Sequence, residues 1–380
     1  MKTIFVGHFA PSCHAMDEAS SAAGNQVQRQ IIKELEFKCG AANVASYSMA
    51  PSPAWPHGPL VSRSLVEGSV AYIGYINLPV IKHIEFAVRL LIAILRSRPQ
   101  LCLQYNSYLF ENIALVLVRL FLSKIALCIC IQDIHVSPQV SIFSKRGLRS
   151  FSERASLWVA RRFNIIVPIS DSIIDDFHLD RSKCFVFQGG ITDYAEKLMK
   201  QSELIPLQDI AVFAGALEPH NGIDLLVDQW ITSKIEWPLH VFGRGSLHEH
   251  VSLAAEHTGK IVFHGFQPEH VVFKWQCKAR WNFCLRYSLG LNERYFFPSK
   301  FFNIVCASGA VLTNDFHGIP VSLREHIIVI SEDLSDLSDR LTETFELADQ
   351  NMVVMRHEIV VDEFSWGTCI GKILEMKNER

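Results

Sequence analysis

The stretch FFPSKFFNIVCASGAVLTN occupies residues 296–314 of this 380-residue chain and combines a loop, a helix and a buried strand. Pro298 ends the loop, and Lys300 lies in the first turn of the predicted helix. Gly309 ends that helix, and the apolar residues after it predict a short strand. A helix N-terminus beside a cation is a natural anion site, because free N–H groups and the helix dipole both favour negative charge. An ordinary helix–strand unit with a surface lysine would give the same pattern.

The composition of the whole chain is that of a globular protein with reduced cysteines. Apolar residues make up 49% of the chain and charged residues 20%, which is enough to fill the cores of two domains. The ten cysteines include no C-x-x-C pair, so we expect neither a disulfide framework nor a zinc site. The net charge of −3 argues against a general nucleic-acid binder.

Positive charge is concentrated in one region, from Val80 to Arg162, which holds 12 Lys and Arg against 4 Asp and Glu. Within it, KRGLRSF at 145–151 and WVARRF at 158–163 interleave cations with aromatic residues. This suits an anionic membrane surface or a phosphate-bearing acceptor, and solvated helix faces would give the same pattern. The most apolar segment, residues 113–131, is interrupted by two cations, so we expect no membrane span. A cytoplasmic protein with peripheral contact at the inner membrane face is the expectation.

A buried strand, a polar tip and a helix recur through the first half of the chain. In open α/β sheets, ligands bind at the carboxyl ends of the strands, so the residues that follow each strand are candidates for a site. Strands are predicted at residues 3–7, 44–49, 101–105, 125–131, 165–169 and 184–187. The candidate residues in the loops after these strands are Gly24, Asn25, Asn106, Asp133 and His135, the last of which could equally be a structural loop histidine.

A second series of strands follows a polar segment, residues 193–208, which we interpret as an interdomain linker. Its predicted strands cover residues 210–214, 239–242, 261–264, 281–285, 310–313 and 327–330. Their polar tips would lie along one edge of one sheet, and they are Gly215, Gly243 with Gly245, Gly265, Arg286 and Ser299-Lys300. Glycines let the backbone approach a diphosphate, and Arg and Lys neutralise it. The pattern predicts an α/β fold with doubly wound parallel sheets.

Here the second half resembles the glycosyltransferases of the GT-B fold, and within them the large retaining family 4. The resemblance rests on FAGAL (213–217) with NGIDLL (221–226), LHVFGRG (239–245), VFHGF (262–266), FPSKFFN through SGAV (297–311) and EFSW (363–366). It implies two Rossmann-like domains that face a cleft, with a C-terminal helix that crosses back to the first domain. The implied boundaries are residues 1–192 for an acceptor-binding domain, 193–208 for the linker, 209–362 for a nucleotide-sugar-binding domain and 363–380 for the final helix.

The resemblance also implies a reaction, in which a sugar is transferred from a UDP- or GDP-linked donor to an acceptor hydroxyl. The reaction would need no metal ion, would retain the configuration of the sugar and would use no cofactor beyond the donor. The acceptor would be a glycan or lipid-linked molecule of a bacterial-type surface polysaccharide or glycolipid assembly. The implied donor-binding residues are Gly215, Asn221, Gly243, Arg244, Gly265, Phe266, Arg286, Ser299, Lys300 and Asn303. Catalytic roles are assigned to Asp133, His135 and Lys300, and contacts in the acceptor loop to Gly24, Asn25 and Asn106.

The chain departs from the family at four charged positions. Two basic residues of the family fall on Ala216 and Asn221, and its two glutamates fall near Tyr295 and Asn303. Asn303 can still hydrogen-bond hydroxyl groups but carries no charge, and Glu293 lies near the place of the first glutamate but out of register. Two alternatives therefore stay open beside the transferase. One is a GT-B protein that binds a nucleotide or glycan with little or no turnover, and the other is a nucleotide-sugar epimerase.

Overall fold

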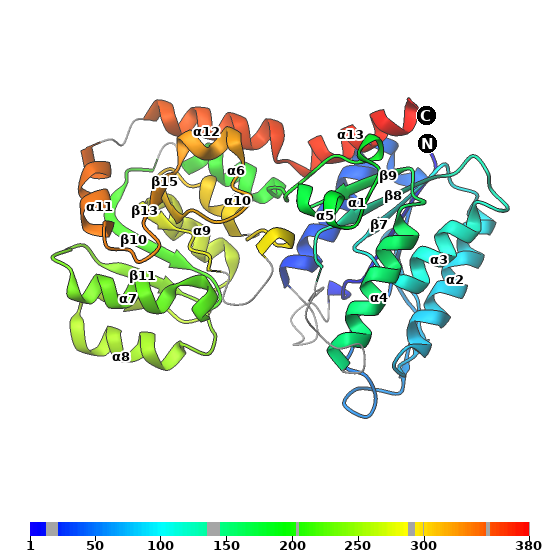
Figure 1. Ribbon diagram of the computed structural model, residues 1–380, viewed down its shortest axis with the longest axis horizontal. Helices are drawn as coiled ribbons and strands as arrows, with labels where there is room; N and C mark the ends of the chain where they lie inside the picture. Colours follow the sequence, from blue (N-terminus) through cyan, green and yellow to red (C-terminus); the bar gives the residue numbers. More distant parts are fainter. Residues whose placement is uncertain are drawn as a thin grey trace. The chain divides into compact units, whose positions relative to one another are not determined.

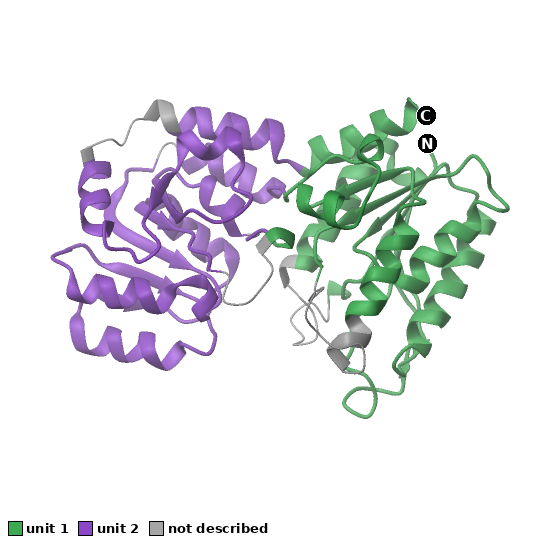
Figure 2. Ribbon diagram, viewed as in Figure 1, with its two compact units in different colours: residues 1–189, 294–296, 366–380 green, residues 190–293, 297–365 purple. Residues whose placement is uncertain are grey.

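The computed structural model describes residues 1–12, 22–134, 145–202, 205–287, 293–298, 300–346 and 350–379. The chain divides into two compact units (Figure 2). Unit 1 comprises Met1–Gly189, Arg294–Phe296 and Trp366–Arg380, and unit 2 comprises Gly190–Glu293 and Phe297–Ser365. No helix within the described ranges is both long enough and apolar enough to cross a lipid bilayer.

Unit 1 is built on a seven-stranded sheet with the order β4-β5-β2-β1-β7-β8-β9. Figure 1 labels three of its neighbouring strands, β7, β8 and β9. Neighbouring strands are parallel except for β4, which runs antiparallel to β5 at the edge. From β5 to β9 the strands follow the order 3-2-1-4-5-6 of the Rossmann fold, so the order reverses between β1 and β7. The strands are β1 (Thr3–Gly7), β2 (Val44–Ser48), β4 (Leu65–Glu67), β5 (Val70–Tyr72), β7 (Leu101–Tyr105), β8 (Ala126–Ile131) and β9 (Ile165–Pro168), and a separate antiparallel pair is formed by β3 (Val61–Ser62) and β6 (Tyr75–Ile76).

The helices of unit 1 cover this sheet because each has one apolar stripe to bury. On one face, α1 and the C-terminal helix α13 pack on apolar side chains of the central strands, and Trp366 and Ile370 of α13 are fully buried there. The final helix thus completes the core of the first unit, as predicted for the GT-B fold. The helices are α1 (Ala22–Cys39), α2 (Ile81–Ser97), α3 (Leu109–Val118), α4 (Lys145–Ala160), α5 (Asp171–Asp176) and α13 (Trp366–Asn378), with short 3₁₀ turns at Ala41–Asn43 and Arg181–Lys183.

Unit 2 is built on a six-stranded sheet with the order β12-β11-β10-β13-β14-β15 and only parallel pairs. This is again the order 3-2-1-4-5-6, with the reversal between β10 and β13. The strands are β10 (Gln208–Ala214), β11 (Leu239–Phe242), β12 (Ile261–Phe263), β13 (Ala279–Phe283), β14 (Ala310–Asn314) and β15 (Ile328–Ile330). The prediction of two Rossmann-like parallel-sheet domains is confirmed.

Two separate apolar cores lie on the two faces of this second sheet. Successive side chains of a strand point to opposite faces of the sheet, so neighbouring residues of β10 pack on different faces. Phe213 belongs to the first core, whereas Val212 packs in a small cluster on the opposite face. Helices α7 (Ile223–Thr232), α8 (His248–Thr258) and α11 (Leu337–Glu346) cover the first face. The second face is covered by α6 (Asp193–Ser202), α9 (Glu269–Lys278), α10 (Lys300–Val305) and α12 (Gln350–Glu363), and 3₁₀ turns lie at Pro219–Asn221, Glu293–Tyr295 and Val321–His326.

Two segments differ from the sequence-based expectations. The segment interpreted as a linker contains α6, whose Ala195 and Met199 are buried in the core of unit 2 despite its polar composition. Residues 184–187, predicted as a strand, form only one isolated bridge, between Ile166 and Cys184. The next bridge along β9 would need a backbone N–H at Pro168, and proline has none. The ladder therefore stops after one pair.

Candidate functional site

The carboxyl edge of the unit 2 sheet brings together most of the residues predicted to bind a donor. Gly215 follows β10 and Arg286 follows β13, the two strands between which the strand order reverses. Ligands of open α/β sheets bind at this switch point, because the loops on its two sides diverge and leave a crevice. Lys300, the first residue of α10, reaches the same place, since its side chain lies against Gly215.

Lys300 carries a buried ammonium group with no hydrogen-bond partner in the described part of the chain. Its Nζ lies 4.7 Å from the centroid of the Phe213 ring, a cation–π contact that only partly replaces lost water. Burial lowers the pKa of Lys300, and the positive charge of Arg286 lowers it further. Burial acts because the ammonium loses its water shell, and Arg286 acts because like charges repel. An anion bound at this edge would supply a counter-ion.

A hollow of about 280 Å³ opens at Gly215, the residue against which Lys300 lies, and we call it the β10 hollow. Its lining residues are Ala214, Gly215, Ala216, Phe242, Gly243, Arg244, Phe266, Gln267 and Val272. The guanidinium of Arg244 lies 4.8 Å from the centroid of the Phe266 ring, which leaves a cation at the rim. Four of the predicted donor residues thus meet in one hollow.

Glycine is required at Gly243 and keeps Lys300 in its place at Gly215. Gly243 has a φ of +150°, and a Cβ there would collide with the carbonyl oxygen of Gly215. At Gly215 itself, a Cβ would lie 2.9 Å from the Lys300 ammonium and displace it. The close approach of the two loops therefore depends on the missing side chains. Gly265, with a φ of +64°, ends β12 without such a contact.

Two predicted donor residues make contacts within the protein instead. Asn221 is buried and donates from Nδ2 to the carbonyl of Ala216 at 2.9 Å, which fixes the turn before α7. Asn303 donates from Nδ2 to Oε1 of Glu269 at 2.9 Å. Ser299 lies outside the described residues, as does His135 of the first unit.

Sequence reasoning missed two residues of this edge. Glu269, the first residue of α9, is exposed and brings a carboxylate next to Asn303. Asn314 ends β14 and holds the tip of β13, because its Oδ1 accepts from the Arg286 N–H at 2.8 Å and its Nδ2 donates to the Arg286 carbonyl at 2.6 Å. A polar residue at the end of a buried apolar strand could have identified Asn314. No local signal links Glu269 to a partner 34 positions away.

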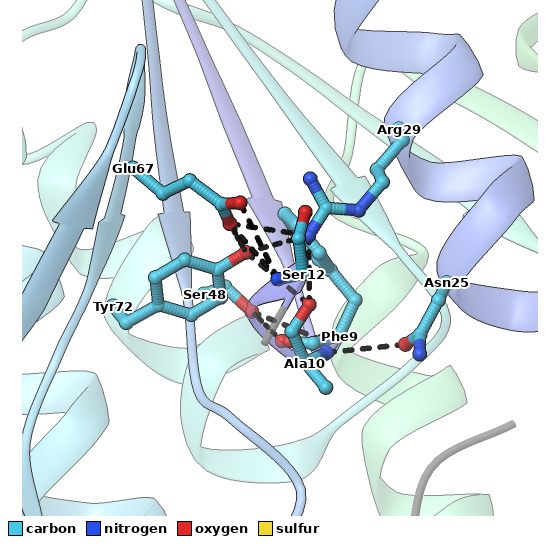
Figure 3. A network of polar contacts seen from close by, with 8 residues as sticks. All are labelled: Phe9, Ala10, Ser12, Asn25, Arg29, Ser48, Glu67 and Tyr72. Atoms are coloured by element: carbon cyan, nitrogen blue, oxygen red, sulfur yellow. Dashed lines mark hydrogen bonds and ion pairs between the residues drawn. The ribbon is translucent and has the colours of Figure 1, made fainter. Parts of the chain in front are cut away.

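In unit 1, the predicted loop residues Gly24 and Asn25 lie in the first turn of α1. Asn25 is buried, and its Oδ1 accepts from the N–H of Ala10 at 3.1 Å, while the carbonyl of Gly24 accepts from the Gln28 side chain. Figure 3 shows this Asn25 contact at the stem of the loop that follows β1. Asn25 therefore braces the loop stem, whereas the Gly24 carbonyl bonds a side chain of its own helix.

The other side of that stem is held by an ionic network (Figure 3). Glu67 accepts from the Ser12 N–H, from Arg29 at 3.2 Å and from the Tyr72 hydroxyl at 3.2 Å. The bonds from Ser12, helped by Arg29, lower the pKa of Glu67 to about 2, although partial burial opposes them. Burial raises the pKa of Tyr72 to about 12. The network anchors residues 10–12 between α1 and the β4–β5 edge.

Asn106 and Asp133 meet at the ends of β7 and β8. Asn106 has a φ of +60°, and its Oδ1 accepts from the N–H groups of Gln132 and Asp133 at 2.9 and 3.2 Å. Its Nδ2 donates to Oδ2 of Asp133 at 3.0 Å. Both line a hollow of about 160 Å³ together with Ser107, Tyr108, Ile134, Glu153, Ser156 and Leu157. Two residues predicted from separate strands are thus neighbours at one edge.

Metal ligation has no candidate cluster in the residues that the structure describes, where no three His, Cys, Asp or Glu side chains are grouped suitably. The metal-independent mechanism stays a prediction.

No protein-family model matches this sequence, and no curated protein matches it by sequence comparison. Solved structures do match over the whole chain. HepE from Anabaena in complex with UDP is 12% identical, with 100% of both chains covered and a TM-score of 0.65. The lipopolysaccharide outer core galactosyltransferase WaaB is 14% identical, with 99% of both chains covered and a TM-score of 0.64. The α,α-trehalose 6-phosphate synthase from Burkholderia multivorans is 9% identical, with 100% of this chain and 98% of that chain covered and a TM-score of 0.63. At these identities the likeness concerns the fold, and the chain has the GT-B fold of two Rossmann-like domains.

Proposed function

We propose that this protein is a glycosyltransferase that moves a sugar from a nucleotide-diphosphate sugar to an acceptor hydroxyl. The observation that carries the proposal is the buried ammonium of Lys300, which has no partner in the described residues and lies at the switch point of the unit 2 sheet. A diphosphate bound there would satisfy this cation and receive N–H groups from the glycine tips. The complex of HepE with UDP and its complex with UDP-glucose support a uridine nucleotide.

The proposed chemistry depends on stabilising a departing nucleoside diphosphate. As the bond between the sugar and the β-phosphate breaks, negative charge grows on the phosphate oxygens. We assign Lys300 and Arg286, whose charges are close enough to repel each other, to neutralising that negative charge. Preorganised charges at a partly buried site act strongly because little reorganisation is needed. The stereochemical course we propose is retention, with no metal ion. Asp133, held by Asn106, is assigned to positioning in the acceptor-binding unit.

The acceptor is proposed to be a glycan or lipid-linked molecule of a surface polysaccharide or glycolipid, which unit 1 would bind. WaaB, a galactosyltransferase of the lipopolysaccharide outer core, supports this class of acceptor. Three helices of unit 1, α2, α3 and α4, also expose apolar side chains to solvent. They lie next to one another, because α3 packs on both α2 and α4. Leu120 is 76% exposed and Phe121 69% exposed, just after α3. The other exposed apolar residues of this face are Ile84, Val88, Ile92, Ile113, Leu117, Phe151 and Trp158.

Cations border this apolar face, which we propose contacts the cytoplasmic surface of an anionic membrane. Arg162 lies 4.2 Å above the Trp158 ring, and Lys124 is exposed near Phe121 in the sequence. Apolar side chains enter the headgroup region while cations pair with anionic lipids. We expect the protein to float with vesicles that contain phosphatidylglycerol and much less with pure phosphatidylcholine. Replacing both Leu120 and Phe121 by Ser should abolish flotation, whereas Val66→Ser, an exposed apolar residue of β4, should not.

The transferase proposal is tested first by binding and then by turnover. A thermal-shift screen with UDP, GDP and ADP should show stabilisation by at least one of them, because a ligand of the folded state raises its stability. A panel of UDP-, GDP-, ADP- and dTDP-sugars with lipid-linked and soluble glycan acceptors should then yield a glycosylated product. Absence of binding and of sugar release with every donor would reject the proposal.

A second candidate is a GT-B protein that binds a nucleotide or glycan without turnover. The contact of Asn303 with Glu269 and the inward contact of Asn221 favour it, since both side chains are committed within the protein. Binding of UDP without any product or sugar release would support this candidate. Product formation that is lost in Lys300→Met would exclude it.

A further inference from the structure

A charged carboxylate is buried at the carboxyl edge of the unit 1 sheet. Glu111 lies in the first turn of α3 and is fully buried. Its Oε1 lies 3.3 Å from Nε2 of His8 and 3.2 Å from Nδ1 of His83. His8 directly follows β1, and α3 follows β7, the two strands between which the strand order reverses. The cluster therefore occupies the position where sheets of this kind bind ligands.

The second oxygen of this carboxylate, Oε2, is buried and has no hydrogen-bond partner in the described part of the chain. Burial on its own would raise the pKa of Glu111, but the two imidazoles outweigh it and lower the pKa to about 2. The carboxylate is thus ionised at neutral pH. A buried charged oxygen without a donor is costly, and such atoms are uncommon in folded proteins. A ligand hydroxyl could serve as the missing donor.

Space for such a ligand lies next to Glu111, in a hollow of about 480 Å³ that we call the His83 hollow. This volume falls within the range of roughly 300–1,000 Å³ that is usual for small-molecule sites. The lining residues are Ala54, Pro79, Val80, Lys82, His83, Ser107, Tyr108, Leu109, Phe110, Glu111, Ser152 and Glu153. Nothing in the sequence-based assignment placed a ligand here, apart from the neighbouring Asn106.

The wall of the hollow carries charges of both signs together with hydroxyl groups and aromatic surface. An anionic ligand would meet Glu111 and Glu153, and a cationic ligand would meet Lys82, whose pKa is already lowered by burial. A neutral molecule with many hydroxyls avoids both repulsions, because a hydroxyl donates to a carboxylate and accepts from an ammonium. Tyr108, stacked on His8 with 3.8 Å between ring centroids, adds a rigid apolar surface for the C–H groups of such a molecule.

We propose that the His83 hollow is a sugar-binding subsite, in which Glu111 accepts a hydrogen bond from a hydroxyl of a neutral glycosyl residue. That this residue belongs to the acceptor rests on the proposed function, whereas the binding of sugar does not. The 160 Å³ hollow beside Asp133 shares Ser107, Tyr108 and Glu153 with the His83 hollow. The two hollows are therefore neighbours, and a ligand of more than one sugar residue could extend from one to the other, so the ligand class that the proposal names is a neutral oligosaccharide.

The test uses the full chain and saturation-transfer NMR with the methyl glycosides of glucose, galactose, mannose and N-acetylglucosamine. At least one glycoside should bind the wild-type protein. Ser152→Trp, which fills the hollow from α4, should abolish that binding. Arg154→Trp places the same side chain on an exposed position of α4 that does not line the hollow, and it should leave binding unchanged. Glu111→Gln should weaken binding by about tenfold or more, since hydrogen bonds to charged groups are the stronger ones.

Unfolding curves of all variants show whether each one folds. If Glu111→Gln does not fold, the comparison of Ser152→Trp with the wild type still decides the test. Failure of every glycoside to bind, or equal binding by wild type and Ser152→Trp, overturns the inference. UDP binding is measured on the same samples. A wild-type protein that binds UDP but none of the glycosides would reject this subsite alone. A wild-type protein that binds a glycoside but none of UDP, GDP and ADP would reject the proposed donor site alone.

Discussion

Replacing Lys300 by Met should stabilise the free protein and at the same time weaken nucleotide binding. In the free protein, the Lys300 ammonium is buried without a hydrogen-bond partner in the described residues, and leaving such a group unsatisfied costs about 1–3 kcal/mol. Met keeps the length and apolar stem of the side chain and removes the charge. The lost cation–π contact with Phe213 offsets about 1 kcal/mol, so the net gain in the free energy of unfolding is about 1 kcal/mol.

The expected loss of binding has the opposite sign and is larger. Removing one partner of a buried, hydrogen-bonded charge pair costs about 2–5 kcal/mol, which corresponds to a Kd raised by about 30-fold or more. Calorimetry measures both quantities, as the unfolding temperature without ligand and as the Kd for the nucleotide that stabilises the wild type. For a unit of this size, 1 kcal/mol corresponds to an increase of roughly 2–4 °C.

The matched control is Lys234→Met, which removes an exposed lysine of unit 2 and should change neither quantity measurably. Two results would refute the reasoning. If Lys300→Met unfolds at a lower temperature than the wild type, the ammonium is stabilised in the free protein. If it binds the nucleotide as tightly as the wild type, the cation does not contact the diphosphate.

Three further predictions concern single residues, each paired with a control position. Gly243→Ala should destabilise unit 2 by more than about 2 kcal/mol and abolish nucleotide binding, because the added Cβ would meet the Gly215 carbonyl. The control Gly259→Ala has a φ of +64° and open space around it, so it should cost only about 1 kcal/mol. Equal losses of the free energy of unfolding in urea would contradict this prediction. Glu67→Gln should lower the free energy of unfolding by about 1 kcal/mol at pH 7, after allowance for solvent screening. The pKa of Glu67 in the folded protein, about 2, lies below the ordinary 4.5, so the difference in stability from the wild type should disappear as the pH falls from about 4.5 to about 2. A difference that does not change with pH would show that the Glu67 carboxylate is not the source of the stabilisation. Arg356→Met should lower the free energy of unfolding by about 3 kcal/mol or more, because this buried guanidinium donates to three backbone carbonyls at the end of α10 and just after it, those of Val305, Ala307 and Gly309. The control Arg324→Met loses an exposed ion pair with Asp315 and should change the free energy of unfolding by less than about 1 kcal/mol.

The sequence predicted five of the seven strands of the unit 1 sheet and all six of the unit 2 sheet, because strands buried on both faces are continuous apolar runs bounded by glycine and polar tips. It missed β4 and β5 at the sheet edge, which are three residues long each and only partly buried. The tips Gly215, Gly243 and Arg286 could be placed together for the same reason, since carboxyl ends of parallel strands share one edge. Contacts between distant positions were not predictable. The pairing of Asn303 with Glu269 depends on how α9 and α10 pack, and the Glu111 cluster joins residues 8, 83 and 111.

One signal for the Glu111 cluster was nevertheless present in the sequence. A single acidic residue interrupts the apolar run of residues 109–118, and a charge at a position that a helix buries needs a partner. Asn221 illustrates the reverse case, in which a polar residue in a loop suggested a ligand contact although its side chain fixes the turn itself. Polar residues of turns serve both purposes, and only their partners distinguish them.

The packing of α13 on α1 has a consequence for the order of events during synthesis. Trp366, Cys369, Ile370 and Ile373 complete the apolar core of unit 1, but they are translated after the whole of unit 2. At roughly 5–20 residues per second, the ribosome takes on the order of 10 s or longer to add the intervening segment. During that interval the core of the first unit lacks the apolar side chains that α13 contributes. The first unit to emerge is therefore the last to be completed.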